Sequence, residues 1–130
     1  MKMLIFLGIS LCVLSIISCC CLTKATNGKF TRKDSGSIFT SSKGGVIEIT
    51  LRGNPTTGYT WNIVEYDPKI LKLEGSTFIR DSDLIGAGGV ETFKFLIIGK
   101  GKTDLVIQYN RVWEKDVKPL ELFKLSISSN

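Results

Sequence analysis

The sequence contains no histidine, and its four cysteines (Cys12, Cys19, Cys20 and Cys21) all lie near the N-terminus. Without histidine, catalysis by an imidazole base and metal binding through imidazole are both excluded. If the segment that carries the cysteines is removed, the remaining domain also lacks a thiol nucleophile and a disulfide. The sequence therefore argues against an enzyme and against a structural zinc site, and we expect no cofactor.

Acidic residues do not supply a catalytic alternative. Asp81 and Asp83 are a possible carboxylate pair, but two acids in a polar loop are more often solvated turn residues. No nucleophile and base can be assembled around them. The chain also lacks a glycosylation sequon, because Pro55 blocks the one outline that Asn54 and Thr56 provide.

The positive charge is modest and scattered. The formal net charge is +5, but Lys2 and Lys24 belong to the N-terminal segment, and no basic run is longer than Arg32-Lys33. A protein that binds nucleic acid concentrates lysine and arginine on one face or along one helix. We therefore expect a soluble domain that binds no nucleic acid.

The N-terminal segment reads as a signal peptide. Lys2 precedes an almost unbroken apolar run at residues 4–17, and small and polar residues follow. This order is typical of a secretory leader, and the run is too short for a comfortable membrane span. We expect a signal peptide over residues 1–25, cleaved between Cys19 and Thr26, and one domain over residues 27–130. The protein would enter the secretory pathway and be secreted or reside in lysosome-like or phagosomal vesicles.

Two alternatives for the triple cysteine stay open. Residues 16–19 resemble a bacterial lipoprotein box, in which Cys19 would be lipidated. An uncleaved segment could instead be palmitoylated at Cys19, Cys20 or Cys21. Only a retained or lipidated leader would bring the protein to a membrane.

The rest of the chain reads as short strands separated by turns, after a short tether that reaches Phe30. Residues 46–52 alternate between polar and apolar side chains, which indicates a strand with one buried face. The further expected strands lie at residues 59–64, 70–73, 78–80, 91–98, 104–112 and 120–127, and residues 99–102 form a turn.

No window shows helical periodicity, and there is no internal repeat or second domain. Many short strands at regular spacing with glycine-rich turns favour an antiparallel β-sandwich or barrel. The cysteine pair of immunoglobulin domains is absent, so a sandwich would be held together without that disulfide.

The most informative segment is Asn54-Pro55-Thr56-Thr57-Gly58-Tyr59. Proline fixes its own φ, the asparagine side chain can bond backbone two residues on, and threonine is stiff at χ1. Glycine is free to take φ > 0 and reverse the chain. The segment thus predicts a stiff loop, with Tyr59 and Trp61 facing inward behind it as support. Read alone, it could also be an ordinary turn.

Two further segments stand on expected loops. Gly86-Ala87-Gly88-Gly89 ends a long polar loop and could be a flexible connector or an anion nest, although no helix and no Lys-Ser/Thr pair follows it. Arg111-Val112-Trp113 leaves one strand before the next begins. Arg111 and Trp113 could instead be strand residues, because a lone tryptophan is by default part of the core.

Together, these three motifs resemble the chagasin family of cysteine-protease inhibitors. That family has an Asn-Pro-Thr-Thr-Gly-aromatic loop, a Gly-x-Gly-Gly loop and an Arg-Pro-Trp loop, in this order. The resemblance covers essentially the whole chain after the leader and implies an immunoglobulin-like sandwich with three loops at one end. Val112 departs from the family's proline, which puts the rigidity of that loop in question.

The resemblance implies a function. The three loops would fill the active-site cleft of a papain-like cysteine protease, with Thr56 and Thr57 nearest the catalytic Cys–His pair. Gly86 to Gly89 would approach one wall of the cleft, and Arg111 and Trp113 would anchor the other. We expect a monomeric, reversible inhibitor. The alternative is an extracellular carbohydrate- or protein-binding sandwich without inhibitory activity.

Overall fold

The structure is a computed structural model that describes residues 24–130. The predicted leader lies almost entirely outside the described residues, and so do all four cysteines. Cleavage and lipidation therefore stay predictions. Within residues 24–130, no helix is long and apolar enough to cross a membrane.

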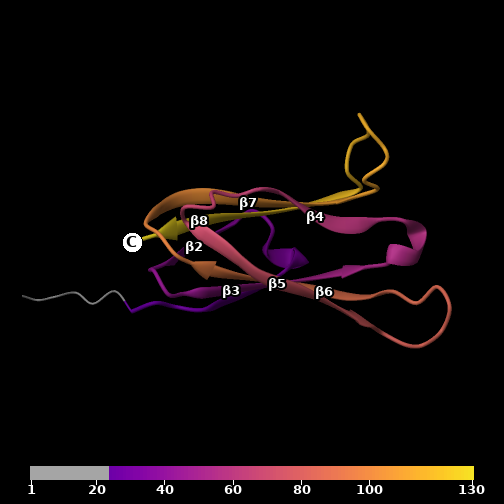
Figure 1. The fold of residues 1–130 in the computed structure, drawn as a ribbon, viewed down its shortest axis with the longest axis horizontal. Helices are drawn as coiled ribbons and strands as arrows, with labels where there is room; N and C mark the ends of the chain where they lie inside the picture. Colours follow the sequence, from indigo (N-terminus) through magenta and orange to yellow (C-terminus); the bar gives the residue numbers. More distant parts are fainter. Residues whose placement is uncertain (1–23) are drawn as a thin grey trace, which may run out of the picture.

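Eight β-strands form two four-stranded sheets packed against each other (Figure 1). The first sheet has the order β1-β3-β6-β5, and the second has the order β2-β8-β7-β4. The strands are β1 (Gly28–Thr31), β2 (Ser37–Ser41), β3 (Val46–Gly53), β4 (Thr60–Glu65), β5 (Leu71–Arg80), β6 (Gly89–Ile97), β7 (Gly101–Asn110) and β8 (Glu121–Ser129). Two single-turn 3-10 helices, η1 (Arg32–Asp34) and η2 (Pro55–Thr57), interrupt the loops. The predicted all-β sandwich is confirmed.

The core lies between the sheets and is made by the apolar faces that the sequence predicts. In β3, for example, Ile47, Ile49 and Leu51 are fully buried. The buried hydrophobic residues are Ile47, Ile49, Leu51, Trp61, Ile70, Leu71, Phe93, Phe95, Ile97, Leu105, Ile107, Tyr109, Phe123, Leu125 and Ile127. Burial of one such aliphatic or phenylalanine side chain contributes about 1.5–3 kcal/mol. Since the described residues contain no cysteine, this core holds the sandwich without a disulfide.

The expectation of a wholly antiparallel sandwich is wrong at two edges. β1 pairs with β3 in parallel, and β2 pairs with β8 in parallel. The expected tether before Phe30 is also wrong, because β1 already begins at Gly28. These two strands have only four and five residues, too few for alternation to stand out in the sequence. Phe30 and Phe39 pack edge to face, with their ring centroids 5.1 Å apart, and join the two edges.

β5 corrects a second expectation. The strands predicted at residues 70–73 and 78–80 are parts of one strand, Leu71–Arg80. Its register against β6 shifts between Leu73 and Gly75, which marks a β-bulge. Every residue of β5 after Leu71 is exposed, since β5 is an edge strand. Its sequence therefore lacks the alternation that a half-buried strand shows.

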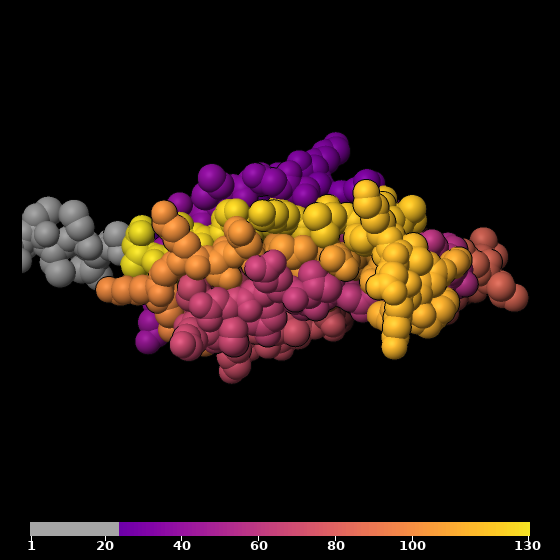
Figure 2. All heavy atoms as spheres, turned by 90° about the horizontal axis from the view of Figure 1, so that it is seen from above, coloured from indigo at the N-terminus to yellow at the C-terminus, as the bar shows by residue number. Residues whose placement is uncertain are grey.

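The connections β3–β4, β5–β6 and β7–β8 all emerge at the end of the sandwich opposite the C-terminus (Figure 1). The β3–β4 connection passes from one sheet to the other, and the other two connections close hairpins. In the view of Figure 2, the same end carries the β7–β8 connection and the tip of the β5–β6 connection. The two layers thus bring together three segments that are far apart in the sequence.

Candidate functional site

The site is the set of these three connections, and it contains all three sequence motifs. We call residues 54–59 the first loop, residues 81–88 the second loop and residues 111–120 the third loop. Gly89 is the exception, because it is the first residue of β6 and is buried. The structure therefore places twelve of the thirteen predicted site residues on the loops at one end and the thirteenth at a loop's base.

The first loop is a capped turn, as predicted. Its helix η2 begins after Asn54, whose Oδ1 accepts a hydrogen bond from the Thr56 N–H at 3.2 Å. The Thr57 N–H donates to the Asn54 carbonyl, and the Gly58 N–H donates to the Pro55 carbonyl at 3.0 Å. Gly58 has φ 82°, in the left-handed region that favours glycine.

A group of aromatic residues supports this turn from below. Trp61 is buried and donates its Nε1–H to the Arg52 carbonyl at 3.0 Å. Tyr109 packs against both Trp61 and Tyr59, with ring centroids 4.8 Å and 5.5 Å away. Its hydroxyl accepts a hydrogen bond from the Asn54 N–H at 2.9 Å. The prediction that Tyr59 and Trp61 support the loop from inside is confirmed, with Tyr59 half-buried.

One side-chain hydrogen bond joins the first loop to the second. Asn54 donates its Nδ2–H to the Gly86 carbonyl at 3.0 Å. The second loop also comes close to the end of β3 at Gly88, where an added Cβ would lie 3.1 Å from the Gly53 carbonyl oxygen. The second loop is closed at its base by a hydrogen bond from the Asp81 N–H to the Gly88 carbonyl at 2.9 Å.

Arg111 joins the first loop to the third. Its Nε–H donates to the Thr57 carbonyl at 3.1 Å, and its guanidinium carbon lies 4.4 Å from the centroid of the Tyr59 ring. Its Nη1 lies 3.1 Å from a carboxylate oxygen of Glu114. The guanidinium is therefore committed to contacts within the molecule, and Arg111 acts as a brace between loops.

Trp113 is a surface residue of the third loop. β7 ends at Asn110, and Trp113 is 64% exposed, so the alternative of a strand residue in the core is wrong. Its neighbour Val112 is exposed as well. The Trp113 ring rests on Gly58, where an added Cβ would lie 2.4 Å from a ring carbon. The first loop thus supports the tryptophan and leaves most of it free.

Two acidic residues near the loops, Asp81 and Glu91, differ in their surroundings. Asp81 forms an ion pair with Arg52, and no group of three His, Cys, Asp or Glu residues within 24–130 could hold a metal ion. Glu91, on β6, lines a hollow of about 290 Å³ together with Pro55, Tyr59 and Phe78. Burial raises the pKa of the Glu91 carboxyl above its ordinary value of 4.5.

Sequence reasoning missed several residues of this site. Glu114 and Tyr109 hold the loops through side-chain contacts, and Leu84 and Ile85 expose apolar side chains at the second loop. The two apolar residues did carry a signal, since they stand in an otherwise polar and glycine-rich loop. The other two carried none, because their partners are set by the tertiary fold.

The fold and the site define a class: a β-sandwich that presents three joined loops at one end. A family model described as "Chagasin family peptidase inhibitor I42" matches residues 40–127. The chain belongs to the chagasin family of peptidase inhibitors.

Individual relatives agree with this assignment. Chagasin from Trypanosoma cruzi is 31% identical over 107 residues, which cover 78% of this chain and 97% of chagasin. Amoebiasin-2 from Entamoeba histolytica is 31% identical over 111 residues, covering 83% of this chain and 89% of the relative. The crystal structure of the cysteine protease inhibitor EhICP2 from Entamoeba histolytica matches with a TM-score of 0.73 and 29% identity, covering 81% of this chain and 96% of that one.

Proposed function

We propose that this protein is a reversible, tight-binding inhibitor of papain-like cysteine proteases that blocks the active-site cleft with its three loops. The observation that carries the proposal is the joining of the three motif loops into one surface by Asn54 and Arg111. Membership of the chagasin family supports it, as does the similarity to EhICP2, which is described as a cysteine protease inhibitor.

In this proposal the first loop occupies the middle of the cleft. Pro55, Thr56 and Thr57 are exposed at its tip and would lie nearest the catalytic Cys–His pair. Gly86, Ala87 and Gly88, above the buried Gly89, would line one wall through close backbone approach. Val112 and Trp113 would contact the other wall, and tryptophan is among the residue types most enriched at binding hot spots.

The geometry of the first loop explains why it would resist cleavage. A peptide bond is cut only when its carbonyl carbon is held in line with the attacking thiolate. Residues 55–57 form a 3-10 turn, which is not the extended backbone of a bound substrate. The carbonyls of Asn54, Pro55 and Thr57 already accept hydrogen bonds within the protein. The turn would have to unfold before the peptide bond after Asn54, Pro55 or Thr57 could be presented to the enzyme.

The same order favours tight binding. Loops that are already fixed lose little conformational freedom when they dock, so more of the contact energy appears as affinity. Protease–inhibitor interfaces of ordinary size, roughly 1,600 Å² in total, are among the tightest known. Three loops on one end of a small sandwich provide a surface suited to such an interface.

Titration of papain with the purified protein tests the proposal. We expect peptidase activity to fall linearly to near zero at one inhibitor per active enzyme, and to return on dilution. Trypsin is the control, because a serine protease should retain full activity. Full papain activity at excess protein, or rapid cutting within residues 54–59, would contradict the proposal.

We further propose that the protein acts in the secretory pathway, as a secreted inhibitor or in lysosome-like or phagosomal vesicles. The support is the sequence of the leader: Lys2, the apolar run at residues 4–17 and the small residues after it. Mass spectrometry of the protein purified from its own cells would test this. An N-terminus between Cys19 and Thr26 is expected, and an intact leader in a cytosolic fraction would contradict it.

A further inference from the structure

The third loop begins with a β-turn whose second residue is valine. The turn is closed by a hydrogen bond from the Glu114 N–H to the Arg111 carbonyl at 3.1 Å. Proline is favoured at the second position of such turns because its ring sets the required φ in advance. Val112 gives the chain no such restraint, yet the turn carries Trp113, the exposed aromatic residue of the proposed interface.

A side-chain contact closes the same turn a second time. Arg111 and Glu114 are joined by an ion pair of 3.1 Å as well as by the main-chain hydrogen bond. The described residues contain five ion pairs, and in this one both side chains are exposed by only about a third, at 34% and 30%. Water and salt therefore screen it less than an ion pair on the open surface.

The ion pair also fixes which way the guanidinium points. Arginine has a planar group with donors in a fixed arrangement, so binding one edge orients the others. With Nη1 on Glu114, the Nε–H of Arg111 reaches the Thr57 carbonyl, and the guanidinium lies over the Tyr59 ring. Glu114 thereby acts on the first loop through Arg111.

A competing partner for Glu114 is close by. Lys118 lines the same small recess as Arg111 and Glu114, but it forms no ion pair with Glu114 among the described residues. The carboxylate thus selects the cation that reaches the first loop.

We propose that Glu114 is a positioning residue that supplies, through Arg111, the restraint that a proline at position 112 would otherwise give. This inference rests on the proposed function for its effect on inhibition, but not for its effect on the free protein. The third loop keeps Trp113 in place by an ion pair where a proline would do so by a covalent ring.

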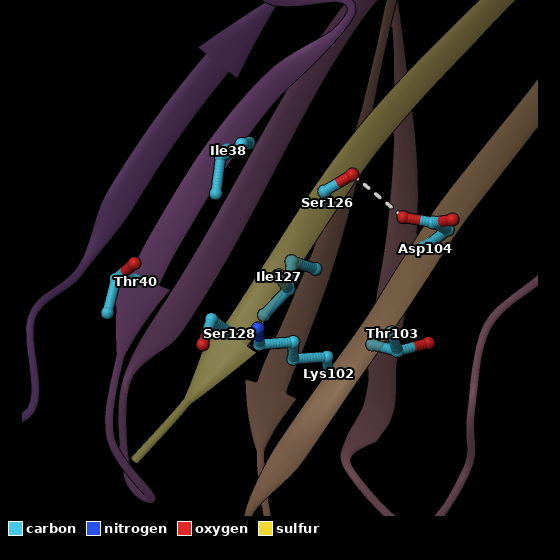
Figure 3. A pocket seen from close by; sticks show the side chains of 8 residues that line it. All are labelled: Ile38, Thr40, Lys102, Thr103, Asp104, Ser126, Ile127 and Ser128. Atoms are coloured by element: carbon cyan, nitrogen blue, oxygen red, sulfur yellow. Dashed lines mark hydrogen bonds between the residues drawn. The ribbon is translucent and has the colours of Figure 1, made fainter.

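The first experiment uses the free protein. Glu114→Gln keeps the size of the side chain and removes its charge. By NMR we expect faster hydrogen exchange at the Glu114 amide and a shifted Tyr59 ring resonance, because the guanidinium leaves the ring. Asp104→Asn is the matched control: Asp104 pairs with Lys124 and accepts a hydrogen bond from Ser126 (Figure 3). It lies near the start of β7, whereas the third loop follows the end of that strand. It should change neither signal.

The second experiment is a double-mutant cycle on papain inhibition. Glu114→Gln should weaken inhibition about threefold to fivefold, the range of a partly exposed ion pair. Val112→Pro should restore most of that loss in the Glu114→Gln background, and its effect in the wild-type background should be smaller. The difference between the two backgrounds cancels any contact that residue 112 makes with the protease. No hydrogen bond of the described residues uses the Val112 N–H, so proline removes none.

Two outcomes would overturn the inference: unchanged exchange and ring shift in Glu114→Gln, or equal effects of Val112→Pro in both backgrounds. If wild-type protein fails to inhibit papain, the proposed function fails, while the NMR comparison still decides the role of Glu114. The two failures are therefore distinguishable.

Discussion

The first and third loops are held in a different way from the second. The first loop has its own capped turn, rests on Tyr109 and is bound to the third loop by Arg111. The second loop is closed at its base by the Asp81–Gly88 hydrogen bond and the Asp81–Arg52 ion pair, and it contains one turn hydrogen bond, from the Ala87 N–H to the Leu84 carbonyl. Only the Asn54 side chain joins it to the first loop by a hydrogen bond among the described residues. Its residues 81–86 are all exposed.

This difference indicates a division of roles within one binding surface. A fixed centre and one fixed flank give precise geometry at low entropic cost, which is what docking into a cleft requires. A less restrained flank that carries glycines and the exposed Leu84 and Ile85 can adjust to cleft walls of different shape. The first and third loops would block the active-site cleft, and the second loop would broaden the range of proteases that are inhibited.

The largest expected effect comes from Gly58→Ala, which breaks the fixed part. Gly58 has φ 82°, and an added Cβ would lie 2.4 Å from the Trp113 ring. The left-handed backbone costs alanine about 1–2 kcal/mol, and displacing a hot-spot tryptophan costs about 2 kcal/mol or more. We expect papain inhibition to weaken by about 3 kcal/mol, measured as the inhibition constant.

The second loop offers a matched control for this substitution. Gly86 has almost the same φ, 81°, but an added Cβ there meets nothing within 4 Å. In the free protein, Gly86→Ala should therefore show the backbone cost alone, about 1–2 kcal/mol at most, measured with Gly58→Ala as the loss in free energy of unfolding. Equal losses for the two variants would remove the contrast between the loops.

Trp113→Ala should have the next largest effect. The side chain is mostly exposed, so its removal should weaken inhibition by about 2 kcal/mol while the unfolding midpoint in urea stays the same. Val117→Ala, on the same loop and also exposed, is the control and should stay within about 0.5 kcal/mol. If the inhibition constant of Trp113→Ala equals that of the wild type, the tryptophan is no anchor.

Asn54→Asp tests the hydrogen bond that joins the first loop to the second. An aspartate still offers oxygens to cap η2, but it loses the Nδ2–H that binds the Gly86 carbonyl. Loss of this one hydrogen bond should weaken inhibition by about 1 kcal/mol and speed hydrogen exchange in the second loop only. Faster exchange in the third loop as well would show that the loops move as one unit.

Much of the fold was predictable, and the failures have a common cause. Strands β3, β7 and β8 were recognised because one face of each enters the core, which forces alternation. Strands β1, β2 and β5 were missed or divided because they are edge strands that are short or exposed, whereas the edge strand β4, expected at residues 59–64, buries Trp61. An edge strand that is short, or exposed along its length, leaves little periodic signal in the sequence.

The site, like the fold, was predictable only in part. Residue type and order along the chain predicted the three loops and the stiff turn at Pro55. The contacts that join the loops were not predictable, because they connect residues 32 and 54 positions apart, as Asn54 with Gly86 and Arg111 with Thr57. Those pairings depend on the sandwich bringing the three connections together.

The smallest expected effect concerns the stability of the fold at the hollow beside the first loop. Burial raises the pKa of Glu91 in the hollow beside Pro55, so the folded protein holds that proton more tightly than the unfolded chain does. Such a group stabilises the fold fully below its unfolded pKa, and that stability is lost as the pH rises through the folded pKa. Glu91→Gln should therefore raise the urea midpoint at pH ~7, and its advantage should shrink well below the ordinary pKa of 4.5.

Glu74→Gln, on the exposed edge of β5, is the control and should leave the midpoint unchanged. A destabilised Glu91→Gln at neutral pH would mean that the charged carboxylate is satisfied in the hollow, and that the base of the first loop is held by it.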